Sequence, residues 1–119
     1  MAKILITDDS TFARLALRKL VLELKPDWDV EECSSPTEAL ARMQEGGIDA
    51  VLIDYHMPQM NGLALAANLI KTYETLEVAL VTANLREKIK DQSEQAGLHY
   101  ISKPVTGDSL SEFLNSVTK

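Results

Sequence analysis

A regular alternation of short apolar runs with longer stretches of helical period is the feature of this sequence that most constrains its fold. In the clearest run, residues 50–53 read Ala-Val-Leu-Ile and are apolar at every position. A strand that offers apolar side chains to both of its faces belongs inside a parallel sheet covered by helices on both sides. Five strand and helix pairs fit in 119 residues, so the sequence predicts a doubly wound α/β fold in one domain, residues 1–119.

Turn and cap residues divide the chain into the expected elements. Pro26 ends the first helix, and residues 35–38, Ser-Pro-Thr-Glu, combine a capping box with proline at the first helical position. We expect strands at 3–7, 29–34, 48–54, 77–82 and 99–102, and helices at about 10–24, from 36 to the glycines 46–47, at 63–73, at 85–96 with Gly97 as C-cap, and from about 106 to 117.

The first expected helix carries two sets of apolar side chains. Phe12, Leu15 and Leu22 lie off its main apolar face, where polar residues are usual. One hypothesis is that this stripe docks a kinase, a phosphatase or a second subunit; the other is that it packs on neighbouring helices of the same molecule. The main face, which we expect to pack on the sheet, consists of Ala13, Ala16, Leu17, Leu20, Val21 and Leu24.

Charge and cysteine content exclude several classes of protein. A formal charge of −6 repels phosphate backbones and anionic lipids, so neither nucleic acid nor a membrane is an expected partner. The apolar run near the N-terminus, residues 4–6, is far too short for a signal peptide or a spanning helix. Cys33 is the single cysteine and is expected to be a reduced, packed thiol. We therefore expect a soluble cytoplasmic protein.

Polar residues follow four of the five expected strands. Asp8 and Asp9 follow the first strand, Asp54 ends the third, Thr82 ends the fourth and Lys103 follows the fifth. Because the carboxyl ends of parallel strands share one edge of the sheet, these side chains are expected to converge. Two carboxylates about 4 Å apart repel by roughly 4 kcal/mol at an effective dielectric constant near 20. A hard cation would offset this repulsion, and oxygen ligands without His or Cys favour Mg²⁺.

These residue types support phosphoryl transfer to a carboxylate. Asp54, at the end of the central strand, is the best placed nucleophile, and its product would be an aspartyl phosphate. Lys103 offers a compact positive charge, and the Thr82 hydroxyl offers a hydrogen bond, to phosphoryl oxygens. Each group alone has an ordinary explanation: the first two acids as helix caps, the threonine as a strand-end hydroxyl and the lysine as a surface charge.

The motifs that contain these residues resemble the receiver domain of bacterial two-component response regulators, close to the single-domain chemotaxis (CheY-like) type. The resemblance covers essentially the whole chain. It is carried by Asp8-Asp9, Asp54-Tyr55-His56-Met57-Pro58, Asn61-Gly62, Thr82-Ala83, Tyr100 and Lys103-Pro104.

The resemblance implies a flavodoxin-like sheet in the order 2-1-3-4-5 and a set of site residues. Asp54 would be the phosphorylation site, with Thr82 and Lys103 assisting and Thr82 and Tyr100 acting as the switch. The Lys103-Pro104 bond is predicted to be cis. Ala83, Asn84 and Pro104 would flank the site, with the side chain of His56 beside them. Mg²⁺ would be held by Asp8, Asp9, Asp54 and the backbone carbonyl of His56.

The same resemblance implies partners. A histidine kinase or phosphotransfer protein would donate the phosphoryl group, and a downstream protein would read the face formed by the fourth helix, the fifth strand and the fifth helix. The chain would be a monomer or weak dimer and a signalling switch rather than an enzyme with an external substrate, catalysing only its own phosphotransfer and dephosphorylation. Because no output domain follows Lys119, the signal is expected to leave through binding; a fragment of a longer regulator stays open.

Three other classes of protein share part of this pattern. A haloacid-dehalogenase-type phosphatase also uses an aspartyl nucleophile, but it places a second acid where Ser10 stands here and adds a cap domain. A flavin carrier needs a phosphate-binding loop after its first strand, where Asp8 and Asp9 would repel the phosphate. A pseudo-receiver would be a phosphate-independent adaptor, and the complete set of acids, hydroxyl and lysine disfavours it.

Overall fold

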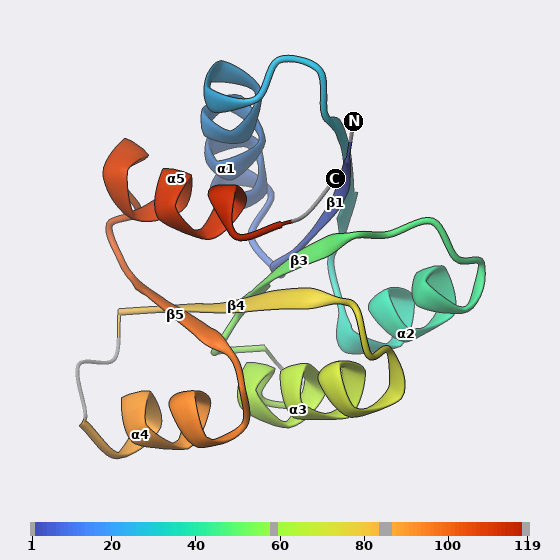
Figure 1. The fold of residues 1–119 in the computed structure, drawn as a ribbon, viewed down its shortest axis with the longest axis vertical. Helices are drawn as coiled ribbons and strands as arrows, with labels where there is room; N and C mark the ends of the chain where they lie inside the picture. The colour runs from blue at the N-terminus through green and yellow to red at the C-terminus, as the bar shows by residue number, and fades with distance from the viewer. Residues whose placement is uncertain (1, 58–59, 84–86, 118–119) are drawn as a thin grey trace.

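A five-stranded parallel sheet lies at the centre of the computed structural model, which describes residues 2–57, 60–83 and 87–117. The strands follow the order β2-β1-β3-β4-β5, so the predicted doubly wound topology is confirmed (Figure 1). β3 is buried along its whole length, as expected for an apolar central strand. The strands are β1 Lys3–Thr7, β2 Asp29–Cys33, β3 Ala50–Asp54, β4 Glu77–Thr82 and β5 His99–Ser102.

Helices alternate with the strands and begin at side-chain caps. The cap residues Ser10, Ser35, Asn61 and Thr106 each accept a hydrogen bond from the backbone N–H three residues further on. The helices are α1 Thr11–Leu24, α2 Pro36–Gln44, α3 Gly62–Thr72, α4 Glu87–Gln95 and α5 Gly107–Asn115.

The capping box predicted for α2 is half formed. Ser35 Oγ accepts from the Glu38 N–H at 3.2 Å, as expected. The carboxylate of Glu38, however, accepts from the N–H and the hydroxyl of Ser34, at 3.1 and 2.8 Å. The predicted return bond to the backbone of the cap residue is thus replaced by bonds to the residue before it.

Two apolar layers sandwich the sheet. α1 and α5 cover one face, where Val21 and Phe113 are buried, and α2, α3 and α4 cover the other, where Met43 and Leu69 are buried (Figure 1). α4 buries few of its side chains in this layer. Of its described side chains, residues 88–95, those of Ile89 and Ser93 are buried.

Several expectations about the elements need correction. The strands predicted at 29–34 and 48–54 are shorter, and α3 begins and ends one residue earlier than predicted. On α1, Ala16 is exposed rather than packed on the sheet, because α1 meets the sheet mainly through Leu17 and Val21. The predicted start of the fourth helix at residue 85 lies outside the described residues. Within the described ranges, no helix is both long and apolar enough to cross a membrane.

Candidate functional site: an acidic cluster with a lysine

Three carboxylates gather where β1 and β3 end. The two strands pair with Thr7 opposite Ile53, so the next residues, Asp8 and Asp54, lie side by side. Asp8 and Asp54 are 2% and 6% exposed, whereas Asp9 is exposed. One carboxylate oxygen from each of the three acids lies within 4.8 Å of the others. The structure therefore brings together the predicted acids from two strands that are far apart in sequence.

Lys103 reaches into this cluster from the end of β5. Its Nζ lies 2.8 Å from Asp54 Oδ1 and 3.8 Å from Asp8 Oδ2. Its backbone N–H donates to the Thr82 carbonyl at 2.9 Å, which attaches the segment after β5 to the end of β4. The Lys103-Pro104 peptide bond is cis, as predicted. One ammonium group is thus shared between two buried carboxylates.

The Asp8 carboxylate is poorly satisfied for a buried charge. Its Oδ1 accepts from the Ser10 N–H at 2.9 Å. Its Oδ2 is the one buried side-chain oxygen or nitrogen among the described residues that lacks a hydrogen-bond partner. Burial raises the pKa of Asp8, the neighbouring Asp54 charge acts in the same direction, and the Ser10 N–H and Lys103 oppose it. This oxygen is suited to an additional cation, because Lys103 lies 3.8 Å away and a buried charge without a hydrogen bond is costly.

Most of the other predicted site residues that the structure describes lie at the ends of β4 and β5 or within β5. Thr82 ends β4 fully buried, while Ala83 and Pro104 are exposed beside it. Asn84 lies outside the described residues. Tyr100 is half-buried on β5 and lies on the side of that strand that faces α4.

The turn after β3 is held close to the site by a glycine. The Gly62 N–H, at the start of α3, donates to the Tyr55 carbonyl at 2.8 Å. A Cβ at position 62 would lie 2.3 Å from the Asp54 carbonyl oxygen, so a side chain cannot be added without moving the backbone that carries Asp54. His56, two residues after Asp54, is exposed, and its ring meets the Tyr55 ring edge-on at 4.9 Å. The role of the His56 carbonyl stays a prediction.

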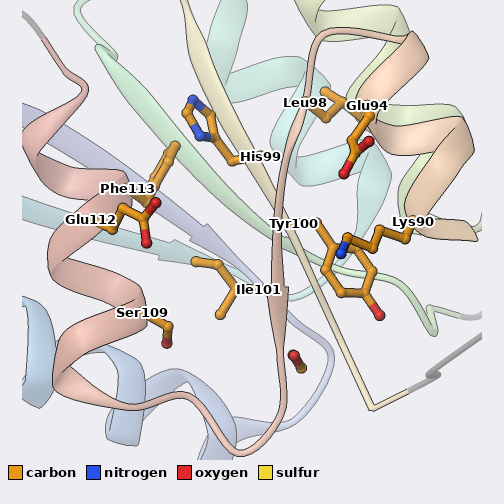
Figure 2. A pocket seen from close by; sticks show the side chains of 10 residues that line it. Lys90, Glu94, Leu98, His99, Tyr100, Ile101, Ser109, Glu112 and Phe113 are labelled. Carbon is orange, nitrogen blue, oxygen red and sulfur yellow. The ribbon is translucent and has the colours of Figure 1, made fainter. Parts of the chain in front are cut away.

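A groove of about 420 Å³ opens between α4, β5 and α5. Figure 2 shows the Tyr100 ring on its α4 side, near Lys90, and His99 with Phe113 on its α5 side. The rings of His99 and Phe113 pack edge-on with centroids 4.9 Å apart. This groove lies on the face that the resemblance predicts as the partner-binding surface. Tyr100 lines it and belongs to β5, the strand that leads directly to Lys103.

Arg14 is a site residue that the sequence reasoning missed. Its guanidinium contacts the backbone of Asp8, although it comes from the first turn of α1. A cation in the first turn of a helix is opposed by the helix dipole. That unfavourable placement, together with the absence of acids from the same turn, is the signal that could have indicated a tertiary role for this arginine.

Comparisons with known proteins identify the family of the chain. The family model of the response regulator receiver domain matches residues 4–115. The chain is 32% identical to chemotaxis protein CheY-3 of Vibrio cholerae, over 97% of this chain and 90% of that protein. It is 31% identical to the cyclic di-GMP phosphodiesterase response regulator RpfG of Xanthomonas campestris, over 86% of this chain but only 28% of that protein.

Solved structures show the same fold. Vibrio cholerae chemotaxis protein CheY4 superposes with a TM-score of 0.86 at 25% identity, covering 99% of both chains. A response regulator receiver domain protein of Clostridium thermocellum superposes with a TM-score of 0.88 at 28% identity, covering 98% of this chain and 93% of that one. Receiver domains of this family are signalling switches of two-component and chemotaxis systems. The chain belongs to the response regulator receiver domain family.

Proposed function

We propose that this receiver domain, spanning residues 1–119, accepts a phosphoryl group on Asp54 and in response changes a protein-binding surface at β5. One observation carries the proposal: Asp54 sits buried among two further carboxylates while its Oδ1 contacts the Lys103 ammonium at 2.8 Å. A nucleophilic carboxylate beside a fixed positive charge is the arrangement that phosphoryl transfer to an aspartate requires.

The acids present fit a magnesium ion. Their three carboxylates each offer an oxygen within 4.8 Å of the other two. Asp8 Oδ2, which lacks a hydrogen-bond partner, is a buried acceptor that a cation would satisfy. Asp8, Asp9, Asp54 and the His56 backbone carbonyl are the proposed holders. When bound, Mg²⁺ would neutralise the charge that develops on the phosphoryl oxygens.

The chain's own residues supply the remaining steps. An Asp54 carboxylate oxygen attacks phosphorus and forms a new O–P bond while the donor's bond to phosphorus breaks. The electron pair of that bond leaves with the donor, which is imidazole for a phosphohistidine or acetate for acetyl phosphate. Lys103, already within reach of Asp54, pairs with a phosphoryl oxygen of the product, and the Thr82 hydroxyl donates a hydrogen bond to another.

The switch follows from the new charge. The phosphoryl group carries roughly two negative charges in place of the single charge of the Asp54 carboxylate, and its new acceptor oxygens draw Thr82 toward them. Thr82 is fully buried at the end of β4 and pairs in register with Ser102 of β5. Its displacement would make room for Tyr100, which now faces the groove between α4, β5 and α5. A protein that reads this groove would then distinguish the two states.

Partners are proposed from chemistry and exposure. A histidine kinase or phosphotransfer protein is the proposed donor, and Phe12 and Leu15, on the turns of α1 nearest the acids, are 84% and 55% exposed. Leu22, the third residue of this predicted stripe, is half-buried. The exposed pair supports the docking hypothesis for a donor. A monomeric or weakly dimeric state and a cytoplasmic location are part of the same proposal.

Labelling with a small phosphodonor tests the proposal. The protein is incubated with acetyl phosphate and Mg²⁺, and its intact mass is measured. We expect a gain of one phosphoryl group that is absent in Asp54→Asn and present in the control Asp49→Asn, which changes an acid next to the opposite end of β3. An unlabelled wild-type protein, or equal labelling of Asp54→Asn, would overturn the assignment.

A further inference from the structure

Arg14 joins three separate pieces of structure around the acid-bearing turn. Its Nη1 donates to the Asp8 carbonyl oxygen at 2.6 Å, and its Nη2 donates to Thr11 Oγ1 at 3.2 Å. Its Nε donates to Glu32 Oε1 of β2 at 3.2 Å. Only 14% of this side chain is exposed. A planar guanidinium that uses three of its nitrogens in this way has little freedom to move.

The contact to the Asp8 carbonyl controls a neighbouring residue. The carbonyl of Asp8 and the N–H of Asp9 belong to one planar peptide unit. Holding the carbonyl oxygen therefore also fixes the orientation of the peptide plane that leads into Asp9. Asp9 itself is exposed. The preceding peptide is fixed as well, because the Asp8 N–H donates to the Cys33 carbonyl of β2 at 3.2 Å.

We propose that Arg14, anchored by Glu32, is a positioning residue that holds the Asp8–Asp9 turn in the conformation that binds the divalent cation. The proposal rests on the proposed function, since it concerns the same acidic site. It assigns Arg14 no contact with the cation or the phosphoryl group. Its effect on the cation passes through the Asp8–Asp9 peptide.

Electrostatics alone predicts the opposite effect of removing Arg14 on cation binding, so the two explanations can be separated by experiment. Arg14 is a positive charge near the acids, so removing it should strengthen cation binding if only long-range electrostatics matters. If positioning matters, removing it should weaken cation binding despite the gain in negative potential. Arg18 provides the matched control, because it also pairs with Glu32, at 3.3 Å, but donates its backbone hydrogen bond to the Val30 carbonyl rather than to Asp8.

The experiment compares Arg14→Met with Arg18→Met in the full chain. Methionine keeps the length of the apolar stem and a high helix propensity while removing every donor. Mg²⁺ is titrated without phosphodonor and followed by amide chemical shifts, and far-UV circular dichroism verifies folding. Loss of a residue that orients metal ligands typically weakens metal binding 10- to 100-fold, so we expect a dissociation constant about ten-fold higher for Arg14→Met and nearly unchanged for Arg18→Met.

Two further measurements separate positioning from other roles. Acetyl phosphate labelling of Arg14→Met should return to the wild-type rate at saturating Mg²⁺, which a lost catalytic group would not allow. Arg14→Lys keeps the positive charge but loses the planar guanidinium that donates to three partners. This variant should also bind Mg²⁺ more weakly than the wild type. Equal or tighter Mg²⁺ binding by Arg14→Met or Arg14→Lys would overturn the proposal. Failure of the wild-type protein to bind Mg²⁺ would instead overturn the proposed function.

Discussion

The two edges of the sheet are built differently. At the β2 edge, Glu31 is paired with Arg42, with one oxygen to nitrogen distance of 3.0 Å, and with Lys3 at 3.3 Å. Its neighbour Glu32 is paired with two arginines of α1 at 3.2 and 3.3 Å. Because successive side chains of a strand point to opposite faces, these two glutamates attach the strand to the helices on both sides.

At the β5 edge the packing is more open. His99 Nε2 lies 3.3 Å from Glu77 Oε2 and 3.4 Å from Ser116 Oγ, and the groove between α4 and α5 begins next to it (Figure 2). The acidic site therefore lies between the β2 edge, which ion pairs attach to the helices (the fastened edge), and the β5 edge, which borders a groove (the open edge). The turn after β1 is held from the β2 side through Arg14 and the Cys33 carbonyl, while Tyr100 lines the groove on the β5 side.

Thr82→Ala tests whether the open edge responds to phosphorylation of Asp54. The expected loss of this response is the largest of the predicted effects. We expect Asp54 to be labelled still, while the phosphate-dependent shifts of β5 amides largely disappear, a loss of coupling of about ten-fold, or about 1.4 kcal/mol. NMR spectra recorded with and without acetyl phosphate measure this. Thr7→Ala is the control, since Thr7 is likewise buried at a strand end but its hydroxyl contacts Cys33 Sγ at 3.2 Å. A full β5 response in Thr82→Ala would contradict the switch.

Asp8→Asn should stabilise the protein without Mg²⁺, because it removes an incompletely paired buried charge. The expected gain at pH 7 is about 1 to 2 kcal/mol in the free energy of unfolding. Burial raises the pKa of Asp8 in the folded state, so the wild-type protein loses stability as pH rises through that raised value. The gain should therefore vanish below the ordinary carboxyl pKa of 3.8. Urea unfolding at several pH values measures it, and a destabilised variant at pH 7 would refute the prediction.

Arg42→Met should weaken the fastened edge by about 1 kcal/mol at pH 7, discounted because Glu31 is about one-third exposed. Hydrogen bonds and charge, chiefly from Arg42 and secondarily from Lys3, lower the pKa of Glu31 from 4.5 to about 2. This contribution is therefore present above pH 4.5 and is lost as pH falls toward 2. Urea unfolding of the variant and wild type should converge over that range. Lys90→Met, on the helix beside the open edge, is the control and should change stability less.

Glu77→Gln should have the smallest effect, under about 0.5 kcal/mol, because its pair with His99 is about one-third exposed, whereas the equally exposed Glu31 pairs with both Lys3 and Arg42. Thermal unfolding at pH 7 measures it, with Glu31→Gln as the matching change on the other edge. A larger loss for Glu77→Gln than for Glu31→Gln would show that the two edges are not different in the way the contacts indicate.

Local patterns predicted most of the elements, and specific residues show why. Ser10, Pro36 and Thr106 act through bonds or dihedrals within one turn of a helix, so their positions could be identified from neighbouring residues alone. Ala16 was misplaced because helical period defines an apolar face only to within a residue or two, while contact with the sheet decides which part of it is covered. The return bond of Glu38 was misplaced because two serines compete for one carboxylate.

Local patterns in the sequence predict the order of strands and helices, and they place the acids, the threonine and the lysine at strand ends. These follow from apolar period and caps, which act over a few residues. Packing across the sheet, by contrast, brings Lys103 to Asp54, leaves one buried Asp8 oxygen without a hydrogen bond and brings Arg14 to the Asp8 backbone. Such contacts join residues up to half the chain apart, and their geometry depends on strand register and on how each helix packs across the sheet.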